Sequence, residues 1–453
     1  MAAGHDGNKS FHRFEASFDC PFEFIAFRMS KRPTPQPKAN FIRRFFSLLG
    51  PGLITGAADD DPSGIATYSI AGAQMGTSML WTAFITWPLM GCVQFMCARI
   101  GMVTGQGLGA AFGRKFPRWI LLLASFALLA ANTINVGSDL SGMADVAEML
   151  TGFNSHWFVV IFGIGIGYAT VRFRYYQIAR ILKWLALCLF AYVITAFIVR
   201  PDWHLVLRDT FIPSWPRNHA AWQNLVAILG TTISPYLFFW QASQEVEEEK
   251  TMGRRMLPQR QGATKREIIE RKLDVGTGTF FSNFVMYFII LTTALTLHAH
   301  GIKDIDTSKQ AAEALKPVAG SIAYTLYTVG LIGVGLLAIP TLSGSAAYAF
   351  AETFKWRQGL DERFRGARYF YCVIILSTVV GIAMDFLGIN PVKALFWTAV
   401  INGVLAPFLL IGILVIACSR QLMQNQPSSM LSRVVVGFTV VAMFGAAIAM
   451  FVL

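Results

Sequence analysis

Three consecutive aspartates, Asp59, Asp60 and Asp61, lie in the middle of an apolar stretch and are followed directly by Pro62-Ser63-Gly64. Carboxylates at the depth of a bilayer are costly, and by default they mark the path of an ion or a substrate. A Pro and a Gly at that depth interrupt the helix, which is tolerated where the backbone lines a cavity. The pattern therefore predicts a broken membrane helix, and the negative charges favour a cation as the cargo.

The composition also indicates a membrane protein. Of the 453 residues, 54% are hydrophobic and 14% are charged, whereas a soluble domain carries about 25% charged residues. The net charge of +12 is compatible with nucleic-acid binding, but the basic residues fall between the apolar runs, as in cytoplasmic loops. We therefore expect membrane lipid as a partner and no nucleic acid.

Several other functional classes are disfavoured. The six cysteines form no CxxC pair and lie mostly in apolar runs, so we expect them to pack in the interior rather than to form disulfides or bind metal. The chain contains no HExxH helix, nucleophile–base motif or Gly-rich phosphate loop. We therefore expect neither an enzyme nor a bound cofactor.

Eleven apolar segments come close to the roughly 20 residues that cross a bilayer as a helix. They lie near residues 49–72, 77–100, 119–149, 157–171, 179–199, 222–245, 276–299, 321–352, 370–388, 391–418 and 432–452. The polar residues 1–45 are expected to form a disordered cytoplasmic tail, which leaves 46–453 as the membrane domain.

Loop charges predict the orientation, because cytoplasmic loops carry an excess of Lys and Arg. Basic residues gather in alternate loops, whereas the connections at 73–76 and 150–156 carry none. We expect a protein of the plasma membrane with its amino terminus inside and its carboxyl terminus outside. The basic clusters lie at 31–44, 114–118, 172–183, 254–272, 357–368 and 420–433.

The odd number of segments suggests two five-helix repeats, about 46–200 and 220–418, with an additional helix at about 432–452. Segments one and six would then correspond. Each is interrupted, the first at Asp61-Pro62-Ser63-Gly64 and the sixth at residues 230–235, Gly-Thr-Thr-Ile-Ser-Pro. Paired interruptions of this kind are the best sequence pointer to a binding site at the membrane midplane.

The two interruptions resemble those of the NRAMP family of divalent-metal transporters, and the similarity covers nearly the whole membrane region. Gly50-Pro51-Gly52, residues 71–76, Val103-Thr104-Gly105 and Arg200-Pro201 also look like family signatures. The resemblance implies an all-α integral membrane protein of about eleven helices, with a leucine-transporter-like inverted 5+5 repeat and broken helices 1 and 6.

The resemblance also implies a ligand set. The family's first-helix motif, Asp-Pro-Gly-Asn, stands here as Asp61-Pro62-Ser63-Gly64, and its sixth-helix motif, Met-Pro-His, stands as Ser234-Pro235-Tyr236. In family members the Asp, the Asn, the Met sulfur and a carbonyl of helix six hold the metal. Gly64 and Ser234 therefore replace two of the usual ligands.

These replacements imply a wider site with oxygen ligands only. We expect its ligands at Asp61, Gly64, Thr231 and Ser234, with Asp60 as a further one. Without a thioether, such a site suits Mg²⁺ and Mn²⁺, as in the family's magnesium-transporting branch. Asp59 is expected to attract cations along the pathway, unless it pairs with a buried Arg or caps a half-helix.

Proton coupling is the second departure from the family pattern. Coupled members keep histidines after the helix-six break and an Asp–Glu pair on helix three, where this chain has Tyr236, Gln241, Asp139 and Gly142. No histidine falls at the midplane, so we expect divalent import by alternating access without obligatory proton coupling. Because Asp139 can relay protons, a proton-coupled Mn²⁺ or Fe²⁺ importer is the alternative.

The sequence leaves two further possibilities open. Asn402, on segment ten, is a candidate for the closing site, although an Asn in such a helix more often forms a hydrogen bond between helices than binds an ion. An amino-acid carrier of the same architecture is a third hypothesis for the function. Such carriers use half-helix amino termini to hold a carboxylate, which three aspartates would repel.

Overall fold

The computed structural model describes residues 51–173 and 188–453, and all regular elements within these ranges are helices. The predicted tail at 1–45 and the first half of predicted segment five lie outside the described residues. Cys20 lies outside them too, and the five described cysteines are free thiols.

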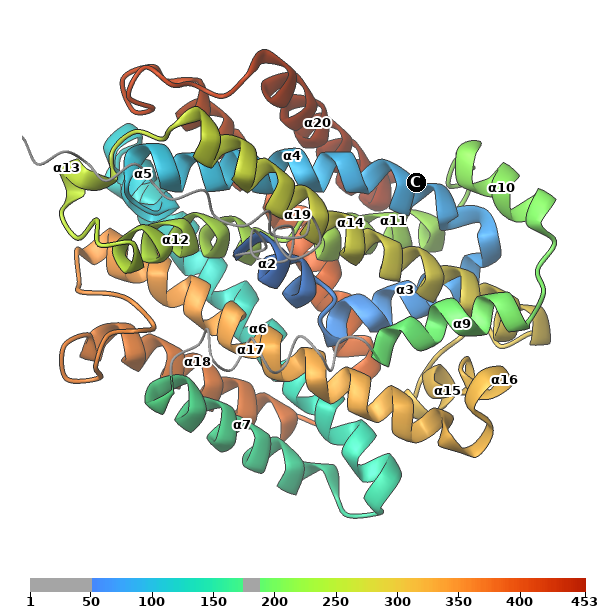
Figure 1. The fold of residues 1–453 in the computed structure, drawn as a ribbon. Coiled ribbons are helices and arrows are strands. Elements are labelled where there is room, and N and C mark those ends of the chain that lie inside the picture. Colours follow the sequence, from blue (N-terminus) through green and yellow to red (C-terminus); the bar gives the residue numbers. More distant parts are fainter. Residues whose placement is uncertain (1–50, 174–187) are drawn as a thin grey trace, which may run out of the picture. The chain divides into compact units, whose positions relative to one another are not determined.

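The helices follow one another along the chain in a single bundle, and Figure 1 labels the larger ones. They are α2 (Pro51–Asp59), α3 (Pro62–Met75), α4 (Leu80–Thr104), α5 (Leu108–Lys115), α6 (Arg118–Thr151), α7 (Ser155–Arg172), α9 (Phe190–Ile198), α10 (Trp203–Phe211), α11 (His219–Thr232), α12 (Pro235–Thr251), α13 (Leu257–Arg260), α14 (Lys265–Thr296), α15 (Ser308–Glu313), α16 (Lys316–Ala319), α17 (Ala323–Phe354), α18 (Arg368–Asp385), α19 (Pro391–Cys418) and α20 (Met430–Val452). Short 3₁₀ turns lie at Gly76–Met79, His298–His300 and Gly320–Ile322.

Both predicted interruptions are present. The first helix ends at Asp59 and resumes at Pro62, after Asp61 has taken an extended conformation with φ −68° and ψ 171°. The second interruption separates α11 from α12, where Ser234 is extended with φ −79° and ψ 134°. In both cases Pro occupies the first helical position, where its missing N–H and fixed φ are tolerated.

Eight stretches of the described chain are long and apolar enough to cross a membrane. They cover the predicted segments except the fourth, which is the 18-residue α7, and the fifth, which is described only in part. The stretches are Pro62–Thr104, Arg118–Thr151, His219–Thr251, Lys265–His300, Ala323–Phe354, Arg368–Asp385, Pro391–Cys418 and Met430–Val452.

Close helix contacts fix the two broken helices in the bundle. A Cβ atom at Gly56 of α2 would lie 2.3 Å from the carbonyl oxygen of Gly278 on α14. A Cβ at Gly230 of α11 would lie 2.0 Å from the carbonyl oxygen of Ala399 on α19. Only glycine allows backbones to approach this closely, as at interfaces between membrane helices.

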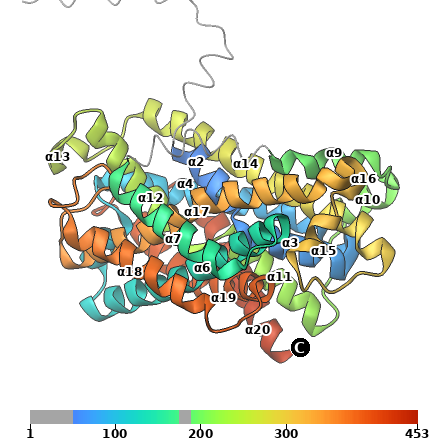
Figure 2. The same ribbon diagram turned by 90° about the horizontal axis from the view of Figure 1, so that it is seen from below.

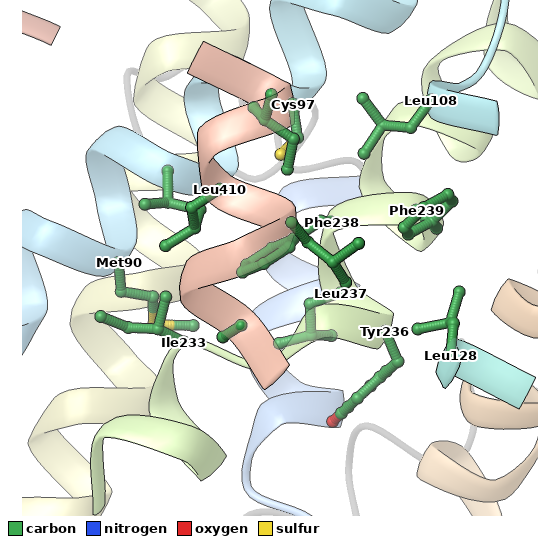
Figure 3. Close-up of a cluster of buried hydrophobic side chains, with 14 of the residues drawn as sticks. Met90, Cys97, Leu108, Leu128, Ile233, Tyr236, Leu237, Phe238, Phe239 and Leu410 are labelled. Carbon is green, nitrogen blue, oxygen red and sulfur yellow. The ribbon is translucent and has the colours of Figure 1, made fainter. Parts of the chain in front are cut away.

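The first turns of α12 lie in the main apolar core. Residues 236–239 are nearly inaccessible to solvent and pack among side chains of α4, α5, α6 and α19. Figure 3 shows Phe238 and Leu237 between Leu410, Met90 and Leu128. In the same turn, the Tyr236 hydroxyl reaches the carbonyl oxygen of Ala58 on α2.

Two of the basic clusters, 254–272 and 357–368, lie at one end of the bundle (Figure 1). The turn after α4, helix α13 and the segment after α17 lie together there, while α10, α15 and α16 lie at the other end (Figures 1 and 2). Gly105, Arg260 and Arg357 line one pocket, which places the three segments side by side. The arrangement fits the predicted alternation of basic loops.

Candidate metal-ion site

Asp61 lies at the break between α2 and α3 and is 1% exposed. Its Oδ1 accepts hydrogen bonds of 2.7 Å from both the backbone N–H of Gly64 and the hydroxyl of Ser63. The carboxylate therefore caps the amino terminus of α3 and is fixed by the helix that follows it.

The other oxygen of Asp61 faces neighbouring helices. The Asn135 amide on α6 and the Tyr236 hydroxyl on α12 both lie 3.4 Å from Oδ2. The Tyr236 hydroxyl also donates to the carbonyl oxygen of Ala58 at 3.0 Å. Elements from both halves of the chain thus converge on this carboxylate.

Gly64 lies where the two breaks face each other. A Cβ atom at this position would lie 3.3 Å from Thr231 Oγ1 and 3.3 Å from the carbonyl oxygen of Asp59. Even a methyl group at Gly64 would therefore be crowded, and the absence of a side chain lets α3 and the end of α11 lie close together. The expectation that Gly64 widens the site stays a prediction.

Ser234 caps the end of α11. Its hydroxyl donates to the carbonyl oxygens of Thr231, at 2.6 Å, and of Gly230, at 2.8 Å. The last turn of a helix leaves such carbonyls without a partner, so Ser234 stabilises the break. A carbonyl oxygen has two lone pairs, and that of Thr231 keeps acceptor capacity for an ion.

The three aspartates do not converge on one point. Asp59 and Asp60 share the hydroxyl of Ser282 on α14, at 2.5 Å and 3.3 Å, whereas Asp61 faces α3, α6 and α12. Oδ1 of Asp59 is buried without a hydrogen-bond partner among the described residues. Within that part of the chain, no group of three or more His, Cys, Asp or Glu is arranged to hold a metal ion.

Asp139 lies on α6 one turn beyond Asn135 and is inaccessible to solvent. Its carboxyl lies near the backbone of Ser63 and close enough to Asp61 for the two charges to interact. The structure therefore brings the only acidic residue left from the family's helix-three pair next to the candidate ligand.

Neither Gln241 nor Asn402 forms a hydrogen bond with Asp61 in the described part of the chain. Gln241 accepts from Thr55 Oγ1 at 2.7 Å and donates to Glu245 at 2.7 Å, so it joins α2 to the outer part of α12. Asn402 is buried on α19, and its Oδ1 has no hydrogen-bond partner in the described chain.

A buried polar network continues from Gln241 away from the break. Arg271 on α14 pairs with Glu245 at 2.7 Å and with Asp274 at 2.6 Å, and it also contacts Glu248. Asp274 in turn accepts from the backbone N–H of Gly52 at 2.8 Å. The network therefore ties the amino-terminal part of α2 to α12 and α14.

Three residues of the site did not emerge from the sequence alone: Asn135, Ser282 and Arg271. For Asn135 a signal was present, because Asn132, Asn135 and Asp139 recur at helical spacing in an otherwise apolar segment and so share one face. Ser282 carries no such signal. The sequence indicates Arg271 only as one member of the basic loop cluster at 254–272.

A bundle of membrane helices in which two broken helices meet at a buried carboxylate has the architecture of a secondary transporter. The family model described as Natural resistance-associated macrophage protein-like, Nramp, matches residues 52–453. The chain therefore belongs to the Nramp family, which confirms the resemblance found in the two motifs.

Curated relatives match over most of their length. The divalent metal cation transporter MntH of Caldanaerobacter subterraneus subsp. tengcongensis is 25% identical over 406 residues, which cover 87% of this chain and 90% of the relative. The transporter of the same name from Chromohalobacter salexigens is 25% identical over 393 residues, with coverage of 84% and 85%.

Solved structures confirm the fold. The Eremococcus coleocola manganese transporter, in complex with an aromatic bis-isothiourea substituted compound, has a TM-score of 0.71 at 17% identity, covering 94% of this chain and 90% of that one. MhsT in complex with L-phenylalanine has a TM-score of 0.55 at 13% identity, covering 87% and 98%. The protein is thus a multi-pass, all-α membrane protein with the leucine-transporter-like fold.

Proposed function

We propose that the protein imports divalent cations, above all Mg²⁺ and Mn²⁺, by alternating access across the cytoplasmic membrane. The observation that carries the proposal is the buried Asp61 carboxylate at one helix break, next to Gly64, which faces Thr231 at the other break. The two relatives described as divalent metal cation transporters support a divalent cargo. The basic loops support an inside amino terminus and an outside carboxyl terminus.

The chemistry of the donors supports the preference for Mg²⁺ and Mn²⁺. We propose Asp61 as the charged ligand, with the Thr231 carbonyl and the Ser234 hydroxyl as neutral ones. These are all oxygens, which suit Mg²⁺ and Mn²⁺ rather than soft transition metals. Mg²⁺ prefers to keep several waters beside one or two carboxylates, which fits a site with Asp61 as its charged ligand.

The surroundings of the breaks argue against an amino-acid cargo. In carriers of amino acids, the amino terminus of a half-helix holds the substrate carboxylate. Here the Asp61 carboxylate itself accepts from the Gly64 N–H at the start of α3. A second carboxylate would meet an occupied donor and a negative charge.

Restoring the softer ligands is expected to shift the selectivity. The double variant Gly64→Asn/Ser234→Met should lower Mg²⁺ influx relative to Mn²⁺ influx, because it adds an amide and a thioether. Flux of each ion into proteoliposomes would be measured side by side. The single variant Gly64→Ala is the control, since its Cβ would also lie 3.3 Å from Thr231 Oγ1 but adds no ligand. An unchanged flux ratio in the double variant would contradict the assignment.

Transport is expected to proceed without stoichiometric proton entry. A divalent ion crossing alone gains roughly 4.6 kcal/mol at 100 mV, inside negative, since each charge gains about 2.3 kcal/mol. In liposomes that contain a pH dye, Mg²⁺ or Mn²⁺ influx should change the internal pH no more than passive proton leak does. The influx itself should increase as the membrane potential becomes more negative inside.

A proton-coupled importer is the second candidate, and Asp139 is the observation that favours it. This buried carboxyl lies beside Asp61 and Ser63, and carboxylates inside membranes serve in proton relays. Acidification that scales with metal flux and disappears in Asp139→Asn would establish this candidate in place of the uncoupled one.

A further inference from the structure

We propose that the connection between α17 and α18 forms a binding site for the phosphate headgroup of an anionic phospholipid. A pocket of about 350 Å³ opens there, lined by Trp356, Arg357, Arg365, Arg368 and Tyr369. This site is independent of the metal-ion site and of the function proposed for it.

The charges in this pocket are only partly neutralised. Arg357 pairs with Glu362 at 2.8 Å. No carboxylate in the described chain lies within ion-pair distance of Arg365 or Arg368, and both side chains are exposed. Guanidinium groups match phosphate in a bidentate geometry, and two of the three arginines keep a charge that no carboxylate of the described chain neutralises.

The start of α18 adds backbone donors. The capping residue Ala367 provides no side-chain hydrogen bond to the first turn of this 18-residue helix. The first N–H groups of a helix lack intrahelical partners and attract anions. A phosphate between Arg365 and Arg368 would therefore also lie near the positive end of the helix.

The surroundings of the pocket indicate a lipid rather than a soluble anion. Trp356 and Tyr369 contact each other with ring centroids 5.2 Å apart, and the Arg368 guanidinium lies 4.9 Å from the Tyr369 ring centre. Trp and Tyr are enriched at the membrane–water interface.

An apolar surface extends along α18 from the same point. Leu376 and Val379 are 57% and 55% exposed, which suits contact with acyl chains. Basic pockets at the ends of membrane helices are a recognised type of site for anionic headgroups. The predicted cytoplasmic position of this loop would place it on the leaflet that carries such lipids.

The test measures phosphatidylglycerol binding to the full chain in detergent, by native mass spectrometry and by lipid-dependent thermal stabilisation. Phosphatidylcholine serves as the neutral comparison. The variant Arg365→Ala/Arg368→Ala should bind phosphatidylglycerol roughly tenfold more weakly or worse, given the contribution of each surface Arg. The variant Arg114→Ala/Arg118→Ala is the matched control, because it removes two exposed arginines from α5 and α6 and should bind as the wild type does.

Equal phosphatidylglycerol affinity of the wild type and the Arg365/Arg368 variant would overturn the proposal. So would equal loss in the control variant, which would indicate a diffuse charge effect. In a separate arm, inorganic phosphate at millimolar concentration should not displace the lipid; displacement would identify a site for soluble phosphate instead. The unliganded melting temperature of each variant shows that the fold is retained.

Discussion

Asp61→Asn is expected to reduce divalent-cation influx to the level of protein-free liposomes while the protein remains folded. The charged ligand is lost, but Asn is as good an N-cap as Asp, so the start of α3 should persist. Influx of Mg²⁺ and Mn²⁺ into proteoliposomes would be measured together with the melting temperature in detergent.

Two further variants separate the charge of Asp61 from its capping role. Asp61→Ala removes both, and should lower the stability by about 1 kcal/mol in addition to abolishing influx. Asp304→Asn, in a connecting segment outside the site, changes the same charge and should transport normally. Near-normal influx in Asp61→Asn would disprove the role of Asp61 as the ligand.

Arg271→Ala is expected to cause the largest loss of stability of any single change proposed here. The Arg271 side chain is 10% exposed, and those of its partners Glu245 and Asp274 are 1% and 0% exposed. Removing one member of a buried ion pair costs about 3–5 kcal/mol, because the remaining charges are left uncompensated. The melting temperature in detergent should fall markedly, because the uncompensated carboxylates of α12 and α14 remain buried.

The same helix offers the matched control. Arg266 pairs with Glu270 at 2.7 Å, but its side chain is 78% exposed, and exposed pairs contribute about 0–1 kcal/mol. Arg266→Ala should therefore melt close to the wild type. Adding Glu245→Gln, Glu248→Gln and Asp274→Asn to Arg271→Ala should recover part of the loss. A variant Arg271→Ala that melts like Arg266→Ala would show that the network does not hold the helices together.

The two networks suggest how binding and movement are connected. Asp61 belongs to the break between α2 and α3, while Gly52 and Thr55 tie the other part of α2 to α14 and α12. A change at the ion site that moves α2 must therefore act against the Arg271 network. Under the proposed alternating access, this network would have to rearrange for the site to open at its end of the bundle.

The sequence by itself determined the all-α membrane fold, both helix breaks and the position of Asp61. These features depend on local chemistry: apolar runs of spanning length, proline at the first helical position, and an aspartate that caps the residues immediately after it. The motif resemblance was equally local, and the family match over 52–453 confirms it.

Only the tertiary structure decided how the polar residues are divided between the break and its surroundings. The sequence placed Asp60 beside Asp61 as a further ligand and Asp59 along the pathway, yet both Asp59 and Asp60 contact Ser282, more than 220 residues away. Asn135 reaches Asp61 across 74 residues, and Thr55 reaches Gln241 across 186. Such partners come together through helix packing, and neither the periodicity nor the spacing of residues along one helix specifies which helix lies opposite.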